Sequence, residues 1–233
     1  MGQPRVTIFA DCGSRVGVGH VMRSLALAEG LTAAGALVSW VAAVSTVPWL
    51  AEFFSRRGIK VSEPPNGSAA TLNAITDTCP SVVVVDSYLD RTQLAQDLKR
   101  RDAKLVAIAD EFTPPLPADL YVSPGIRAGW AETSASRLIG GPEHVLIRED
   151  IRALRPHVWN PRPTSSPCRI ALRLGGTDGD GAAPSLLALL RGLSSVTHID
   201  VSPSTPGTVR ALRDLSPESN QRIHLTQAGP DSF

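Results

Sequence analysis

The chain has 233 residues, with 23 Lys and Arg against 22 Asp and Glu, so its formal net charge is +1. Hydrophobic residues make up 42% of the sequence and charged residues 19%, which excludes a disordered or fibrous chain. The balanced charge argues against a nucleic-acid partner, because such proteins carry a clustered basic surplus. This length fits one large domain or two smaller ones.

The three cysteines, Cys12, Cys79 and Cys168, form no CxxC pair and no Cys/His cluster. We therefore expect neither a disulfide framework nor a structural zinc, and the pattern fits a reducing compartment. The N-terminal segment lacks an apolar run of signal-peptide length. The sequence thus predicts a cytoplasmic protein that uses no metal and no other cofactor.

Residues 30–51 carry no charge and are numerous enough to span a bilayer. The stretch is interrupted by Gly35, Pro48 and several Ser and Thr residues. We interpret it as a helix end, a buried strand, a loop and a helix start, so no membrane span is expected.

Apolar segments alternate in type along the first two thirds of the chain. Strands are expected at 6–10, 37–44, 60–62, 81–85 and 104–109, and helices at 21–34, 47–57, 69–76 and 94–101. Four consecutive valines, at 82–85, are typical of a strand covered on both faces. The alternation predicts an open parallel α/β sheet with right-handed crossovers.

Residues 157–167 are rich in proline and show no helical or strand period, which indicates an interdomain linker. Beyond them the alternation restarts, with strands expected at 169–174, 198–201 and 222–226 and helices at 183–193 and 206–215. We therefore predict a Rossmann-like domain over 1–156, the linker, and a partial second domain over 168–233.

The loop from Asp11 to His20 follows the first expected strand. Ligands of open α/β sheets bind at the carboxyl ends of strands, and Gly17 and Gly19 allow the backbone to approach a ligand. The helix N-terminus behind the loop favours an anion and disfavours imidazolium, which suits His20 to act as a neutral base. The alternative interpretation is a tight turn followed by a structural histidine.

Two further groups of polar residues follow strands. Asp86, Ser87 and Tyr88 come after the valine strand, and Asp110 and Glu111 after the next one. The topology should direct both groups into the same cleft as the first loop. The alternatives are that Asp86 caps a turn and that the Asp110–Glu111 pair is a solvated helix cap.

A third loop, residues 175–181, is rich in glycine and precedes the expected helix at 183–193. Such a loop suits a phosphate or a diphosphate. It contains the letters DGDG but lacks the spacing of a calcium-binding EF-hand, so a metal is not expected there.

Four segments, taken in this order, resemble one family. They are ADCGSRVGVGHVMRSLALAEGL, VVVVDSY, LIGGPEHVLIRED and RIALRLGGTDGDG. The combination is similar to UDP-2,4-diacetamido-2,4,6-trideoxy-β-L-altropyranose hydrolase of pseudaminic acid biosynthesis and to spore-coat polysaccharide biosynthesis proteins. That group is related to GT-B glycosyltransferases.

The resemblance implies a GT-B-like fold and an enzyme that releases UDP from a sugar nucleotide in the biosynthesis of a surface glycan or a nonulosonic acid. It implies catalytic roles for His20, Tyr88 and Asp11. The substrate-binding residues that it implies are Gly17, Gly19, Arg23, Asp86, Asp110, Gly175, Gly176, Thr177 and Asp178. The expected partner is a UDP-sugar, and a transient association with a membrane surface or with pathway enzymes stays open.

The chain also departs from the family pattern. It has Glu111 where the family has a second aspartate, Ser123 where Asn is frequent, and Arg173-Leu174 where a Ser-Phe pair precedes the glycines. Family members continue for roughly another hundred residues, a size typical of half a domain or more. A glycosyltransferase on the same scaffold and an inactive truncated remnant are therefore the alternative hypotheses.

Overall fold

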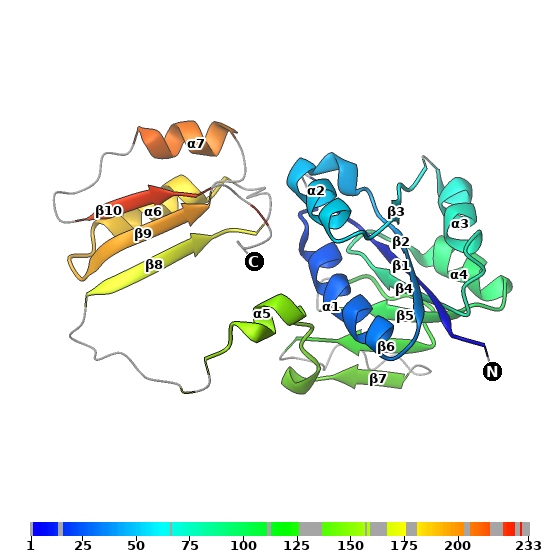
Figure 1. The fold of residues 1–233 in the computed structure, drawn as a ribbon. Helices are drawn as coiled ribbons and strands as arrows, with labels where there is room; N and C mark the ends of the chain where they lie inside the picture. The colour runs from blue at the N-terminus through cyan, green and yellow to red at the C-terminus, as the bar shows by residue number, and fades with distance from the viewer. Residues whose placement is uncertain are drawn as a thin grey trace.

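The computed structural model of the chain describes residues 2–13, 16–65, 67–110, 113–125, 137–156, 158, 167–175, 181–202, 206–214, 221–226 and 229. Two parallel sheets organise these residues (Figure 1). The α/β class and the parallel sheets expected from the sequence are confirmed.

The first sheet has seven strands in the order β3-β2-β1-β4-β5-β6-β7. The strands are β1 (Arg5–Ala10), β2 (Leu37–Val41), β3 (Val61–Ser62), β4 (Val82–Asp86), β5 (Lys104–Ile108), β6 (Leu120–Ser123) and β7 (Arg137–Gly140). The helices between and after them are α1 (Gly19–Ala33), α2 (Pro48–Arg56), α3 (Ser68–Thr76), α4 (Thr92–Arg100) and α5 (Glu149–Ala153), with 3-10 turns at Val44–Thr46 and Pro142–His144. All strand pairs are parallel.

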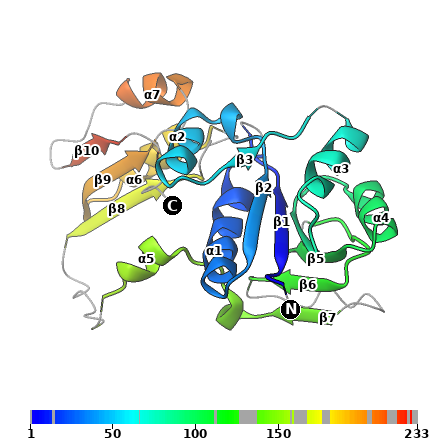
Figure 2. The same cartoon turned by 45° about the vertical axis from the view of Figure 1, so that its right-hand side comes forward.

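Both faces of this sheet are covered (Figure 2). On the face of α1 and α2, Ile8 and Val84 pack into one buried core with Phe54. On the face of α3 and α4, Val83 and Val85 belong to a second core. The valine run therefore faces two cores in alternation, as expected for a strand buried on both sides.

The second sheet has three strands in the order β10-β9-β8 and is parallel throughout. Its elements are β8 (Cys168–Arg173), α6 (Ala183–Arg191), β9 (Val196–Ser202), α7 (Pro206–Arg213) and β10 (Arg222–Leu225). One core, built around Leu187, Ile199, Val201 and Leu212, lies on one face of this sheet.

The main differences from the sequence expectations lie in the last third of the first sheet. β6, β7 and α5 were not expected, because each has only four or five residues and no clear period. The strand expected over 37–44 ends at Val41, and Val44 begins a 3-10 turn. The expected linker lies almost wholly outside the described residues, so the domain boundary stays a prediction.

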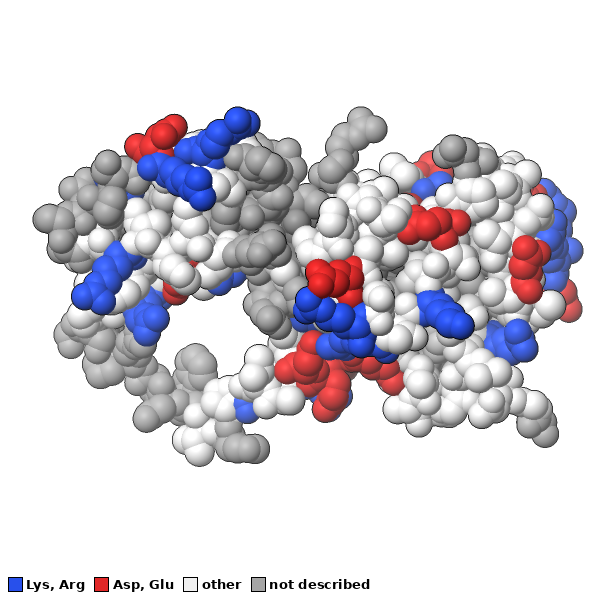
Figure 3. Space-filling model, turned by 45° about the horizontal axis from the view of Figure 1, so that its top comes forward, with Lys and Arg blue, Asp and Glu red and all other residues white. Residues whose placement is uncertain are grey.

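Among the described residues, no helix is both long enough and apolar enough to cross a membrane. The uncharged stretch 30–51 instead contains the end of α1, β2, the first 3-10 turn and the start of α2. On the face shown in Figure 3, Lys and Arg side chains are interspersed with Asp and Glu side chains, and neither sign forms a continuous field.

Candidate active site

Three aspartates lie at the carboxyl ends of three adjacent strands of the first sheet. Asp11 follows β1, Asp86 is the last residue of β4, and Asp110 comes shortly after β5. The register aligns Ala10 with Asp86 and Asp86 with Ile108. The chain leaves β1 toward β2 on one side and reaches β4 on the other, which makes this a topological switch point, where ligands of open α/β sheets bind.

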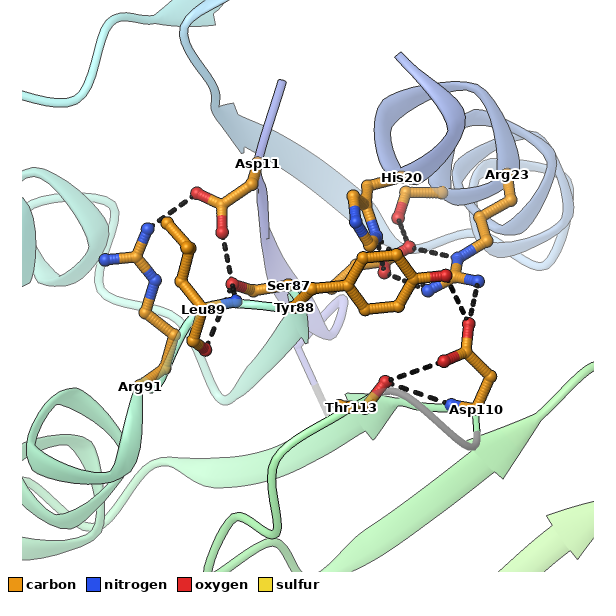
Figure 4. Close-up of polar contacts among 11 residues, drawn as sticks. Asp11, His20, Arg23, Ser87, Tyr88, Leu89, Arg91, Asp110 and Thr113 are labelled. Carbon is orange, nitrogen blue, oxygen red and sulfur yellow. Dashed lines mark hydrogen bonds and ion pairs between the residues drawn. The ribbon is translucent and has the colours of Figure 1, made fainter. Parts of the chain in front are cut away.

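Asp86 is completely buried and accepts hydrogen bonds from one face of α1, the face that carries His20 and Arg23 (His20 and Arg23 are labelled in Figure 4). Its Oδ1 lies 2.6 Å from His20 Nδ1 and 2.5 Å from Arg23 Nη2. Its Oδ2 accepts from Arg23 Nε at 2.8 Å and from Ser24 Oγ at 3.0 Å. Residues 20, 23 and 24 share a face because helical neighbours recur every three or four residues.

The contact with Asp86 determines the tautomer of His20. A carboxylate only accepts hydrogen bonds, so Nδ1 of His20 carries the proton and donates to Asp86. Arg23 Nη2, at 3.2 Å from Nδ1, is then a second donor directed at the same oxygen rather than a donor to the ring. The other ring nitrogen, Nε2, is buried and has no hydrogen-bond partner among the described residues.

Arg23 connects Asp86 to Asp110 and Tyr88. Its Nη1 lies 3.1 Å from Asp110 Oδ2, and the Tyr88 hydroxyl donates to the same oxygen at 2.6 Å. Burial alone would lower the pKa of the Arg23 guanidinium, but the hydrogen bonds and charge of Asp86, with Asp110, raise it above its ordinary value. Burial, together with the hydrogen bond to Asp110 and its charge, raises the pKa of Tyr88 to about 12. Arg23 therefore stays a cation and Tyr88 a neutral donor.

Asp11 belongs to a neighbouring group rather than to the contacts around His20. Its Oδ2 accepts from the Ser87 hydroxyl, and its Oδ1 lies 2.7 Å from Arg91 Nη2. The Arg91 guanidinium also lies 5.1 Å from the centre of the Phe9 ring. A cavity of about 410 Å³ opens beside Asp11 and Arg91, at the starts of α3 and α4.

The glycine loop before α1 has two distinct parts. Gly17 has φ +83° and exchanges backbone hydrogen bonds with Gly13, so its amide is used within the loop. A side chain at Gly19 would meet only open space, which leaves the first turn of α1 accessible. Within the described part of the loop and helix, that end of α1 has neither a side-chain cap nor an acidic residue in its first turn.

Of the second glycine-rich loop, only Gly175 (φ +63°) and Gly181 are described. The expected site residues Gly176, Thr177 and Asp178 lie outside the described residues, as does Glu111. Over the described ranges, no group of three or more His, Cys, Asp or Glu residues could hold a metal ion.

Two residues of the site, Ser24 and Arg91, were not predicted from the sequence. Ser24 lies one helical turn after His20, and that spacing was available in the sequence. Arg91 pairs with Asp11 across 80 positions, and no local pattern announces such a contact.

No family model matches the chain, and no curated protein matches it. Solved structures do match. MurG from Acinetobacter baumannii is similar with a TM-score of 0.56 and 13% identity, over 97% of this chain and 68% of that one. An α-glucosyltransferase in complex with UDP and a 13-mer DNA gives a TM-score of 0.53 at 13% identity, over 99% and 69%.

A heptosyltransferase, WaaC from E. coli, is similar with a TM-score of 0.46 and 13% identity, over 98% of this chain and 78% of that one. The two structures with the higher TM-scores, MurG and the α-glucosyltransferase, confirm the GT-B-like fold expected from the sequence. The narrower resemblance to the pseudaminic acid pathway hydrolase finds no support among these matches.

Proposed function

We propose that this chain is a nucleotide-sugar hydrolase that releases UDP. Water adds to the anomeric carbon, the bond from that carbon to the diphosphate oxygen breaks, and the products are the free sugar and UDP. The observation that carries the proposal is the state of His20, which is 3% exposed, with Nδ1 held by Asp86 and Nε2 without a partner among the described residues.

A general base needs an unprotonated nitrogen that can reach the proton it removes. In the tautomer set by Asp86, His20 Nε2 carries the lone pair and accepts the proton of the attacking water. The positive charge that then develops on the ring is stabilised by the Asp86 carboxylate at 2.6 Å.

The departing diphosphate needs stabilisation of its growing negative charge. The first turn of α1 supplies the backbone N–H groups of a helix start and the positive end of the helix dipole, and among the described residues it has no side-chain cap and no acidic residue of its own. Gly19 leaves room for the anion to approach. Gly175 and the expected residues Gly176, Thr177 and Asp178 are proposed to contribute from the second glycine-rich loop.

The structure favours different roles for some of the expected residues. Asp86, fully buried with both oxygens occupied, acts as a positioning residue for His20 rather than as a direct substrate contact. Arg23 holds that carboxylate through two hydrogen bonds, a geometry that fixes its orientation. Asp110 and Asp11, which are only partly buried, are proposed to contact sugar hydroxyls, and for Asp11 this role takes the place of the catalytic one that the resemblance implied.

Glycosyl transfer to an alcohol acceptor is the second candidate, and the same geometry supports it equally. The base would then take its proton from a hydroxyl group instead of water. One similar structure is of an α-glucosyltransferase in complex with UDP, which supports UDP as the leaving group in either reaction.

The test measures UDP release from a panel of UDP-sugars, including a 2,4-diacetamido-trideoxy sugar, with and without hydroxyl-bearing acceptors. The proposal expects release without an acceptor, and a loss of about 10² to 10⁴ in turnover for His20→Ala, the usual contribution of a positioned base. His224→Ala is the matched control, because His224 is 72% exposed on β10.

Release that requires an acceptor would favour the transferase. Calorimetry with UDP tests the remaining hypothesis, that of an inactive remnant. A folded protein that neither binds UDP nor turns over any substrate of the panel would identify an inactive remnant and refute both enzymatic proposals.

A further inference from the structure

The ring of Tyr88 lies across the imidazole of His20 (Figure 4). The two ring centres are 4.3 Å apart and the ring planes are inclined by 76°, an edge-to-face packing. His20 is 3% exposed in this arrangement, and its Nε2 is buried.

This packing conflicts with the chemistry proposed for His20. A base must be within hydrogen-bond reach of its proton donor. Water has no access to Nε2 here, so the arrangement cannot support proton transfer from water.

The position of Tyr88 would allow its side chain to rotate away from His20. It lies in the segment between the end of β4 at Asp86 and the start of α4 at Thr92, outside any helix or strand. Its side chain is 41% exposed, so one part of it faces solvent while another packs on His20. Its hydroxyl donates to Asp110, and Arg23 lies 5.9 Å from its ring centre.

We propose that Tyr88 is a gating residue whose ring closes His20 Nε2 from water until a ligand displaces it. The gate acts by side-chain rotation in the segment after β4. The packing of the ring on His20 holds the closed position, and the hydroxyl contact with Asp110 adds to it. This role, carried by the ring, takes the place of the catalytic role that the family resemblance implied for Tyr88.

The consequence for specificity rests on the proposed function. When the ring covers Nε2, the base cannot activate bulk water, so proton removal becomes dependent on ligand binding. A gate of this kind determines how readily water competes with any other hydroxyl for the reaction.

The test measures the reactivity of each histidine toward diethyl pyrocarbonate, followed by peptide mass spectrometry. In the wild-type protein, His20 should react at least about tenfold more slowly than His144 and His224, which are 42% and 72% exposed. Tyr88→Ala should raise the His20 rate at least about tenfold. Tyr88→Phe should keep most of the protection, since it retains the ring.

Leu89→Ala is the matched control, because Leu89 is the next residue and is 48% exposed. This variant should leave the His20 rate unchanged. The part-buried His198 on β9 reports on folding, and its rate should not change in any variant.

Fast labelling of His20 in the wild type, or no acceleration in Tyr88→Ala, would overturn the gate. Equal acceleration in Tyr88→Phe and Tyr88→Ala would also overturn it, because the hydroxyl and not the ring would then be responsible. The experiment uses no sugar nucleotide, so an inactive protein with a protected His20 would refute the proposed function and leave the gate standing.

Discussion

The two sheets of this protein bury their strands differently. In the seven-stranded sheet, consecutive residues of β4 face two separate apolar cores. In the three-stranded sheet, Ile170, Ile199 and Ile223 face the single core, whereas the opposite face carries Arg169, His198 and Arg222 in one row. One sheet is the middle layer of three, and in the other the described residues form a core on one face.

The difference explains where a buried polar site can form. At the carboxyl edge of the seven-stranded sheet, Asp86 and His20 are buried, and shifted pKa values occur at Arg23 and Tyr88. Burial of this kind strengthens electrostatic interactions and is typical of functional sites. In the small sheet, the His224 ring lies 3.3 Å from Asp200 while His224 is 72% exposed, and such exposed polar contacts contribute little.

The strongest test of this comparison introduces the same charge into both sheets. Ala107 on β5 is fully buried, whereas Ala171 on β8 is exposed and pairs with Asp200. Ala107→Arg should cost several kcal/mol, a large share of the roughly 5 to 15 kcal/mol that stabilises a domain. Ala171→Arg should stay within about 0.5 kcal/mol of the wild type. Urea unfolding followed by circular dichroism measures both, and equal losses would contradict the one-sided burial of the small sheet.

A second pair of substitutions compares the cores themselves. Leu98 on α4 and Leu187 on α6 are both fully buried in helices that cover a sheet. Leu98→Ala should cost about 3 to 5 kcal/mol, and Leu187→Ala about 2 to 3 kcal/mol, because a small core covered on one side can collapse around the cavity. Denaturant midpoints provide the measurement. A larger loss for Leu187→Ala would show that the small sheet is the more tightly packed.

The third prediction concerns the ionisation of Tyr88. The difference in tyrosinate absorbance between the wild type and Tyr88→Phe reports on Tyr88 alone. This difference should titrate near pH 12 rather than near 10, because burial and Asp110 favour the neutral phenol. Since the folded pKa is the higher one, Tyr88 contributes stability that is complete below pH 10 and is lost as the pH rises to about 12. Asp110→Asn should lower the midpoint, and a midpoint that does not move would exclude Asp110 as a cause.

The smallest expected effect is a difference in thiol reactivity. Burial, with the charges of Glu63 and Asp11, raises the pKa of Cys12 to about 12, whereas Cys79 and Cys168 are exposed. At mildly alkaline pH, two thiols should react quickly with an aromatic disulfide reagent and Cys12 slowly. Cys12→Ser should remove only the slow phase. Loss of a fast phase instead would show that the loop after β1 is open to solvent.

Much of the architecture was predictable because its signals are local. The valine run at 82–85 indicated a strand buried on both faces, and Val83, Val84 and Val85 are buried in two cores. In β8, Arg169, Ala171 and Arg173 alternate with apolar residues, a period that already distinguishes a strand buried on one face. β6 and β7 were missed because four residues are too few to show a period.

The candidate site was predictable only in part. The topology of an open α/β sheet brings residues at strand ends to one edge, so Asp11, Asp86 and Asp110 could be expected near one another. Their hydrogen-bond partners could not be predicted, because they lie far away in the sequence. Asp11 bonds to Ser87 and Arg91, whereas Asp86 bonds to residues of α1. Three neighbouring carboxylates thus have different surroundings, which depend on packing between helices.

By itself, the sequence determined most of the strands and helices, β6, β7 and α5 excepted, that the sheets are parallel, and that polar residues follow β1, β4 and β5. These features follow from hydrophobic period and turn chemistry over a few residues. Only the tertiary structure decided that Asp86 is buried, that it holds His20 across 66 positions, and that Tyr88 covers the imidazole. Such contacts arise when elements distant in sequence pack at the same edge of the sheet. The sequence around one residue of a pair therefore does not predict its partner.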